Sequence, residues 1–470
     1  DGIYNSDNDW LKRYFTVIKM NTEVNDWISI GLNSKYTRQQ VVRPTIWSYG
    51  QNDGQLFTNL STNPNLPDYD DNGSPNEFSM VPNLDGLSGS FSNTTDDIWL
   101  TGQIELKPVK GLSIKGDYTW SVKNKYDNNT QLVFGSYDAD GTPKPSRRSP
   151  TLDRVIKQYS NTNYHNINLV ATYNLDFEKH SLTVLAGYNE ELNKFNMMYG
   201  TNTEFYTQSI PSISTSYGDS PVLTDAVYSW ATQGYFGRLS YNFRETYLLD
   251  LNVRYDASSK YSPDTRWAFF PSVSVGYNVA KEEFWPLKDA VKMFKLKGSW
   301  GQLGNNAGDI YAYLPTLGTG SQTPVILDGG RLPYVTMPGI ISSDLTWTKP
   351  RTIGFGVEMG ALNNRLTIDY DWYQRTVFDQ LGPAEQYSEV LGTAAPKRNN
   401  AVSETRGWEL ALGWKDEAFM LKGSPVSYGV RAGVSDYVGY VVEYESNSSG
   451  TRSGWTPGQV FGELYGYTSS

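Results

Sequence analysis

The sequence predicts an all-β fold, a large antiparallel transmembrane β-barrel to which this chain contributes about fourteen strands. Apolar residues alternate with polar ones along the chain, which is the period of a strand with one apolar and one polar face. The predicted strands are about ten to fourteen residues long, whereas strands of soluble proteins usually have about five or six. Short and long connections follow one another in turn, as they do at the two rims of a membrane barrel.

The composition of the 470 residues excludes several classes of protein. Hydrophobic residues make up 38% and charged residues 19%, with 43 Gly, 34 Tyr and 14 Trp, which fits neither a coiled coil nor a disordered chain. No apolar run approaches the roughly 18 residues that a membrane helix needs. The net charge of −10 disfavours nucleic acid as a partner. Because the sequence has 0 Cys, disulfides and thiolate metal sites are excluded.

The clearest hairpin lies in the middle of the chain. Residues 235–243 and 247–255 both carry apolar side chains at odd positions, and residues 244–246 form the turn between them. The row from Tyr247 to Tyr255 spans roughly 26 Å along the strand, or about 20 Å across a membrane after a tilt of about 40°. That is close to an apolar band between two aromatic girdles. The same alternation predicts strands within 28–33, 112–120, 166–175, 272–278, 366–371, 408–414 and 428–434.

The connections between the predicted strands alternate in length. Short ones are expected near Asn21–Glu23, Pro108–Lys110, Glu178–His180, Arg244–Thr246, Ala361–Arg365 and Asp416–Pro425, with one of medium length at Ala280–Lys292. Long ones, rich in Asn, Ser, Thr and Gly, are expected at 37–97, 122–163, 191–229, 303–345, 377–403 and from 437 onward, with Ala257–Arg266 as a short exception. A soluble β-sandwich or propeller is the alternative, but it has no reason to keep this parity.

The two ends of the sequence suggest that the barrel is incomplete. The predicted strands run from Lys12 to about Asp436, and the chain begins at Asp1 without Met and ends in the loop-like segment 467–470. An open sheet would expose two unpaired edges to lipid, which is not viable. We therefore expect residues 1–470 to form part of one barrel domain whose terminal strands lie outside this sequence.

One long stretch is similar to a known family. Residues 254–277, RYDASSKYSPDTRWAFFPSVSVGY, resemble the signature of the SusC/RagA family, TonB-dependent outer-membrane importers of Bacteroidetes. We expect this motif to build the barrel and not to bind a ligand. Further matching segments follow in the family's order, at 296–305, 345–349, 363–366, 391–409 and 457–467. The resemblance covers about residues 230–470, and the earlier half fits only by its strand pattern.

The resemblance implies a location, a function and a set of partners. It implies a multi-pass barrel of the bacterial outer membrane that imports an oligosaccharide or peptide, with an N-terminal plug domain outside this sequence. It also implies a SusD-like surface lipoprotein, energy from the TonB–ExbB–ExbD complex, contact with outer-membrane lipid, and a dimer of SusC–SusD pairs. A passive outer-membrane porin and a soluble surface carbohydrate-binding β protein are the alternatives.

Two groups of residues are candidates for contact with the transported molecule. Polar side chains opposite the apolar rows are expected to form a lumen-facing wall, at Arg238, Asp250, Arg254, Glu358, Asp369 and Arg431. Aromatic side chains lie among amide and hydroxyl residues in the loops, at Trp47, Tyr49, Tyr137, Tyr311 and Tyr313. Their faces suit the C–H faces of sugar rings, and suit peptides nearly as well. Packing between loops, or against a partner protein, is the alternative.

The sequence gives little support to catalysis or to a cofactor. His165 and His180 have no ligand-spaced His and no nucleophile motif beside them, so we expect no enzyme activity. An acidic segment begins like an EF-hand loop, at Asp68, Asp70 and Asn72. Its twelfth position is Ser79 where the motif needs Glu, so a solvated loop is expected, with a weak Ca²⁺ site in an outer loop as the alternative.

Overall fold

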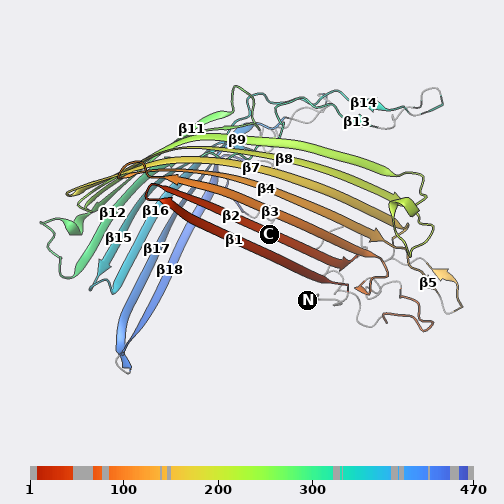
Figure 1. Cartoon of the computed structure of the whole chain (residues 1–470), viewed down its shortest axis with the longest axis horizontal. Helices are drawn as coiled ribbons and strands as arrows, with labels where there is room; N and C mark the ends of the chain where they lie inside the picture. Colours follow the sequence, from red (N-terminus) through yellow and green to blue (C-terminus); the bar gives the residue numbers. More distant parts are fainter. Residues whose placement is uncertain are drawn as a thin grey trace, which may run out of the picture. The chain divides into compact units, whose positions relative to one another are not determined.

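The described part of the chain folds mainly into long strands. The computed structural model describes residues 8–45, 67–76, 84–137, 140–144, 150–320, 326, 329–330, 332–382, 390, 396–421, 424–444 and 455–463. Fourteen strands form one hydrogen-bonded sheet, in the order in which they occur along the chain (Figure 1). The all-β class and the predicted number of strands are therefore confirmed.

The strands of the sheet are β1 (Trp10–Asn25), β2 (Ile28–Pro44), β3 (Ser90–Leu106), β4 (Leu112–Gln131), β7 (Arg154–Phe177), β8 (His180–Thr203), β9 (Val222–Phe243), β10 (Tyr247–Ser258), β11 (Trp267–Asn278), β12 (Val291–Gln302), β15 (Lys349–Ala361), β16 (Leu366–Leu381), β17 (Asn399–Leu421) and β18 (Ser424–Tyr444). Two short pairs lie outside it, β5 (Ser136–Tyr137) with β6 (Pro143–Lys144) and β13 (Thr319–Gly320) with β14 (Tyr334–Val335). The short 3₁₀ helices are η1 (Ile213–Thr215) and η2 (Val279–Lys281). No helix in the described part of the chain has the length and apolar character needed to cross a membrane.

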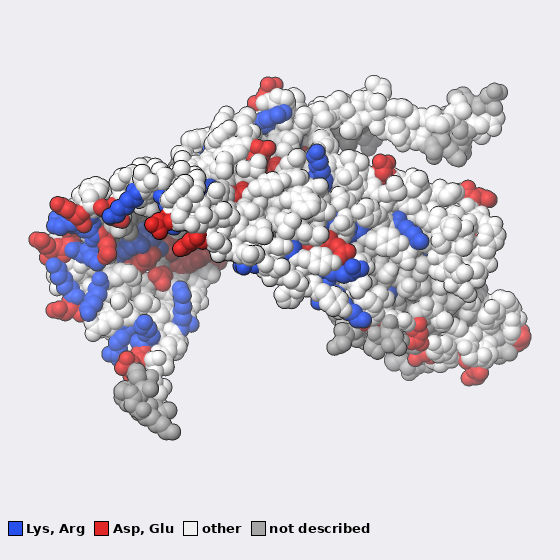
Figure 2. All heavy atoms as spheres, in the orientation of Figure 1, with Lys and Arg blue, Asp and Glu red and all other residues white. Residues whose placement is uncertain are grey.

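The contacts divide the chain into two compact units. The first unit comprises residues 1–104, 117–166 and 192–229, and the second comprises residues 105–116, 167–191 and 230–470. Within the second unit, β15, β16, β17 and β18 lie side by side as an antiparallel series (Figure 1). Where Figure 1 labels β12 and β15–β18 of the second unit, Figure 2 shows Lys and Arg mixed with Asp and Glu. The second unit carries most of the candidate site.

The central hairpin of the second unit forms as the alternation predicts. Tyr247 pairs with Phe243 on one side and with Tyr277 on the other, so β9, β10 and β11 keep their odd positions on one face. The turn needs two left-handed residues, Arg244 at φ 57° and Glu245 at φ 53°. It is closed by a 2.9 Å hydrogen bond from the Thr246 N–H to the Phe243 carbonyl.

The odd-numbered face of β9–β11 is apolar and exposed, and aromatic residues lie at both of its ends. In the middle of the row, Val253 is 44% exposed and Val275 is 54% exposed. At the end with the short turns, the rings of Tyr247 and Tyr277 stack with their centroids 5.1 Å apart. At the other end, the rings of Tyr255 and Trp267 stack at 4.7 Å. The strand register continues this surface onto β12, β15 and β16. We call it the apolar face, and we call the opposite side of the same strands the polar face.

The long loops of the second unit leave from one end of its strands. Residues 303–348 connect β12 to β15, and residues 382–398 connect β16 to β17. We call this the long-loop end, and the end with the turns at 244–246, 279–290 and 362–365 the short-turn end. The segregation of long loops from short turns agrees with the predicted parity.

Several predicted connections were wrong in position because the strands are longer than expected. Asn21–Glu23 lies within β1, and β1 is joined to β2 at residues 26–27. Asp416–Pro425 is mostly strand, since β17 continues to Leu421 and β18 starts at Ser424. Most of the long connections begin later and end earlier than predicted, because strand segments that are polar on both faces read as loops in the sequence. The connection predicted at 303–345 instead begins as predicted and continues to residue 348.

Candidate functional site

The six predicted wall residues lie on the polar face of the second unit, and each of them occurs in an ion pair. The Arg238 Nη2 of β9 lies 2.7 Å from the Asp250 Oδ1 of β10, and Arg238 Nε donates to the same oxygen at 3.1 Å. The Ser240 hydroxyl also donates to this carboxylate. The pairing follows from the register, in which Ser240 is opposite Asp250. A negative charge on this face is thus held by a cation and a hydroxyl.

The next strands carry a larger network of charges. Glu358 of β15 accepts contacts from Lys295 Nζ at 3.2 Å and from Lys297 Nζ at 3.0 Å, both on β12. Lys297 also lies 3.1 Å from Asp371 of β16. Glu358 was predicted from the sequence, but Lys295, Lys297 and Asp371 were not. A signal for the two lysines was present, because 295 and 297 are both odd positions in a strand whose central even positions are apolar.

A groove lies over this network. It has a volume of about 420 Å³ and is lined by residues of β10, β11, β12, β15 and β16, including Asp250, Lys295, Lys297 and Asp371. Gly356 keeps the groove open, because a Cβ there would lie 2.1 Å from Asp371 Oδ1 and 2.7 Å from Lys297 Cε. The groove presents both signs of charge with serine and threonine hydroxyls, a lining that suits polar solutes.

Two further wall residues have partners of different kinds. Arg254 lies 3.0 Å from Asp256 of its own strand and not from a neighbouring strand, and its guanidinium lies 5.2 Å from the Phe236 ring. Arg431 and Asp369 are 3.8 Å apart, and the Arg431 side chain is 75% exposed. Ion pairs on the polar face thus connect β9 with β10, connect β12 with both β15 and β16, and connect β16 with β18.

The loop aromatic residues fall in different parts of the chain. Trp47 and Tyr49 lie outside the described residues. Tyr137 belongs to the first unit, is 43% exposed, and its carbonyl accepts a 3.1 Å hydrogen bond from the Asn72 amide. Tyr311 and Tyr313 belong to the second unit, where Tyr311 is 38% exposed with φ 64° and Tyr313 is half-buried. Tyr137, Tyr311 and Tyr313 therefore each keep part of their surface accessible.

The acidic segment uses its oxygen atoms in a turn. The Asp70 carboxylate accepts a 2.8 Å hydrogen bond from the Asn76 amide, and the Asn72 side chain accepts one of 3.0 Å from the Ser74 N–H. Across the residues that the structure describes, no group of three or more His, Cys, Asp or Glu side chains could hold a metal. The Ca²⁺ site proposed for Asp68, Asp70 and Asn72 stays a prediction.

The signature stretch 254–277 builds a small core at the long-loop end. Tyr261 is 2% exposed, and its ring lies 5.7 Å from that of Trp347, which also packs on Phe270 at 5.4 Å. The Trp347 indole donates to the Arg266 carbonyl at 2.8 Å. Burial raises the pKa of the Tyr261 phenol, against the lowering effect of a hydrogen bond from the Gly308 backbone. The motif therefore fastens a long loop to a short one.

Comparison with protein-family models matches residues 30–469 to the family described as TonB dependent receptor-like, beta-barrel. The chain belongs to this family. TonB-dependent receptor P3 of Formosa agariphila is 25% identical over 310 residues, which cover 65% of this chain and 29% of that receptor. TonB-dependent receptor SusC of Bacteroides thetaiotaomicron is 31% identical over 182 residues, which cover 38% of this chain and 18% of SusC.

The solved structures give the same fold. The structure of the RagAB peptide transporter matches with a TM-score of 0.76 at 21% identity, over 93% of this chain and 47% of that chain. These findings confirm the SusC/RagA resemblance, the barrel fold and the outer-membrane location. The chain spans 29% and 18% of the length of the two curated relatives named above.

Proposed function

We propose that the protein to which this chain belongs imports an oligosaccharide or a peptide across the outer membrane. The observation that carries the proposal is the wall of paired charges on the polar face, set against the exposed apolar rows of the same strands. In a barrel whose apolar face meets lipid, the polar face lines the lumen. Arg238, Asp250, Arg254, Glu358, Asp369 and Arg431 then form part of the inner wall, as expected from the sequence.

The wall suits the passage of a polar solute without chemistry. Pairing of opposite charges, as between Lys297 and Glu358 at 3.0 Å, avoids a strong field of one sign that would hold a charged substrate. The wall groups exchange hydrogen bonds with water and solute alike, so they lower the cost of desolvating the substrate. No covalent catalyst is needed, and we propose that the protein is not an enzyme.

We propose that partner proteins supply the energy for import and capture the substrate. Family membership supports drive by the TonB–ExbB–ExbD complex through a plug domain, because an outer membrane has no ATP. The similarity to SusC and the fold shared with the RagAB transporter support a SusD-like lipoprotein that covers the outer loops, and a dimer of such pairs. The exposed aromatic residues Tyr137 and Tyr311 are candidates to contact a sugar or peptide.

The test is uptake by cells that carry the full-length protein without its TonB-binding segment. Labelled oligosaccharides and labelled peptides are offered separately, and both surface binding and internal label are measured. We expect one class to bind as in the parent strain while its uptake is abolished. Continued uptake at the parental rate would identify a passive porin instead.

A further inference from the structure

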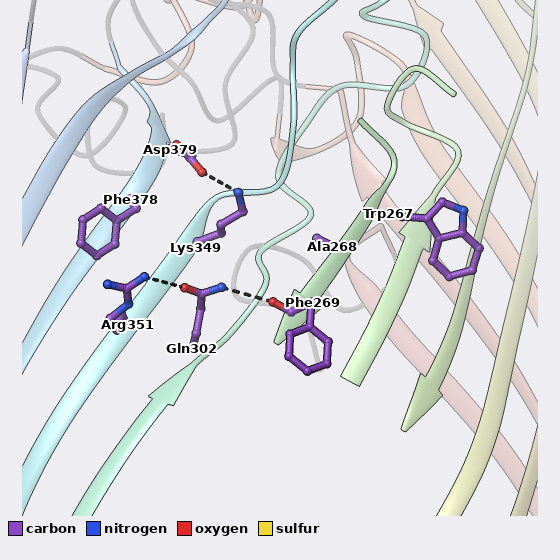
Figure 3. A pocket seen from close by; sticks show the side chains of 8 residues that line it. All are labelled: Trp267, Ala268, Phe269, Gln302, Lys349, Arg351, Phe378 and Asp379. Atoms are coloured by element: carbon purple, nitrogen blue, oxygen red, sulfur yellow. Dashed lines mark hydrogen bonds and ion pairs between the residues drawn. The ribbon is translucent and has the colours of Figure 1, made fainter. Parts of the chain in front are cut away.

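A pocket with basic side chains lies on the apolar face of the second unit, away from the polar wall. Its volume is about 520 Å³, and it is lined by Trp267, Ala268, Phe269, Gln302, Lys349, Arg351, Phe378 and Asp379 (Figure 3). The register places Phe269 with Tyr255, Gln302 with Arg351 and Lys349 with Phe378 on the face of the apolar rows. The pocket is at the long-loop end, beside the aromatic pair Tyr255 and Trp267.

Two cations in this pocket face a single carboxylate. Lys349 Nζ lies 2.8 Å from Asp379 Oδ2, so this charge is paired. Arg351 has no carboxylate in the pocket, and its Nη2 donates to the amide oxygen of Gln302 at 3.1 Å (Figure 3). The Arg351 Nε is buried without a hydrogen-bond partner among the described residues. The pocket therefore has a surplus positive charge.

Neighbouring aromatic rings hold the Arg351 guanidinium in place. Its Cζ lies 4.6 Å from the Phe378 ring and 5.9 Å from the Trp300 ring. Glu404 of β17, on the same face, accepts hydrogen bonds from Gln374 at 2.7 Å and from Thr376 at 3.1 Å, so its charge is already satisfied. A planar guanidinium that is fixed between rings and has no carboxylate partner in the pocket can bind a phosphate through its terminal N–H groups.

The surroundings of the pocket indicate where such a phosphate comes from. Below the pocket the same face continues as an apolar row, in which Phe355 is 59% exposed and Val275 is 54% exposed. A ligand with a phosphate and long acyl chains fits both parts, since the chains cover the row while the phosphate meets Arg351. The long-loop end of a barrel of this kind faces the outer leaflet.

We propose that this pocket binds the phosphorylated headgroup of an outer-leaflet glycolipid of the lipid A type, with Arg351 and Lys349 as the phosphate ligands. Trp267 and Phe269 lie at the level where the headgroups end and the acyl chains begin, where aromatic side chains are favoured. An occupied pocket tethers β11, β12, β15 and β16 to the outer leaflet beneath the two long loops.

The experiment measures lipid binding by the full-length protein in detergent, using native mass spectrometry. The probes are bisphosphorylated lipid A, the same lipid A with its phosphates removed, and inorganic phosphate. The test variant is Arg351→Gln, and the control is Lys288→Gln/Lys292→Gln, which removes two exposed positive charges near the short-turn end. Because a lost charge-assisted contact costs about tenfold in affinity, we expect lipid A to bind about tenfold more weakly to Arg351→Gln and equally well to the control.

Three outcomes would overturn the proposal. They are equal binding of lipid A by Arg351→Gln and the parent, equal binding of the dephosphorylated lipid, and displacement of lipid A by inorganic phosphate, which would indicate a free-anion site. If Arg351→Gln fails to fold, the pair variant Lys349→Gln/Asp379→Asn takes its place, because it removes a cation without leaving a carboxylate unpaired. Substrate uptake is not the readout, so failure here leaves the proposed import untouched.

Discussion

A charge placed on the apolar face should cost far more stability than the same charge placed on the polar face. Leu251 lies in the middle of the row from Tyr247 to Tyr255, opposite Leu239 on one neighbouring strand and Val273 on the other. Its side chain is 39% exposed, although it is one of the most apolar residue types. We predict that Leu251→Lys strongly destabilises the protein in a membrane, because it puts an ammonium group into hydrocarbon.

The size of the effect follows from the position of Leu251 along the strand. Tyr247 and Tyr255 are eight positions apart, so Leu251 lies about 13 Å along the strand from each, near the middle of the bilayer. A Lys at the midplane of an outer-membrane barrel costs about 2–4 kcal/mol. That corresponds to a shift in the unfolding equilibrium of about 30-fold to about 700-fold.

The assay is reversible unfolding of the full-length protein in guanidinium chloride, after folding into phospholipid vesicles. Ser274→Lys is the matched control, since Ser274 is opposite Asp250 on the polar face. We expect it to change the free energy of unfolding by less than about 0.5 kcal/mol, as at a hydrated surface. Equal losses from the two variants, or a larger loss from Ser274→Lys, would refute the assignment of the two faces.

Three further predictions concern the loops and the wall. Trp347→Ala should open the small core at the long-loop end, at a local cost of about 3–5 kcal/mol. It should speed proteolysis of the loop 303–348 without changing the unfolding of the strands. The control is Leu303→Ala, at a side chain that is 68% exposed, and it should leave proteolysis unchanged. Burial raises the pKa of the Tyr261 phenol above its ordinary 10.0, so the contribution of the buried neutral phenol to folding stability is complete below pH 10.0 and is lost as the pH rises through the folded-state pKa. An ultraviolet titration of Tyr261→Phe should therefore show one late-titrating phenol fewer than the parent. An unchanged titration curve would contradict this. In a double-mutant cycle of Arg238→Gln and Asp250→Asn, the coupling energy should stay below about 1 kcal/mol, since the two side chains are 52% and 34% exposed; a larger value would mean that the pair is shielded from water.

The strand faces could be predicted from the sequence because one physical rule acts on every second residue. In β9 and β10 the alternation from Tyr235 to Tyr255 gave the turn at 244–246 without error, since both faces of the hairpin differ clearly in polarity. The ion pairs were harder to predict. Lys297 contacts Glu358 and Asp371 only because β12, β15 and β16 are adjacent in the sheet. The sequence of a strand does not show which other strand it pairs with across a long loop.

The strand ends could not be predicted for a different reason. Residues 191–203 read as the start of a long loop, yet β8 continues through them to Thr203. The same holds for 122–131 of β4, where asparagine, lysine and aspartate occupy both faces. Hydrophobic periodicity reports only the part of a strand that meets lipid on one side, so an extension with water on both sides carries no such signal.

The lengths of the strands also explain the position of the lipid pocket. Even a strand of 12 residues such as β12 is about 40 Å long, or about 30 Å across the membrane after a tilt of about 40°, whereas the apolar band of a barrel is about 25 Å tall. Such strands must therefore pass a boundary at which the outward face changes from apolar to polar. On β12 and β15 that change occurs between Trp300 and Gln302, and between Ile353 and Arg351. A cation at this boundary is close to the lipid phosphates and lies above the hydrocarbon, so the residues that end the apolar band are also those best placed to bind the headgroup.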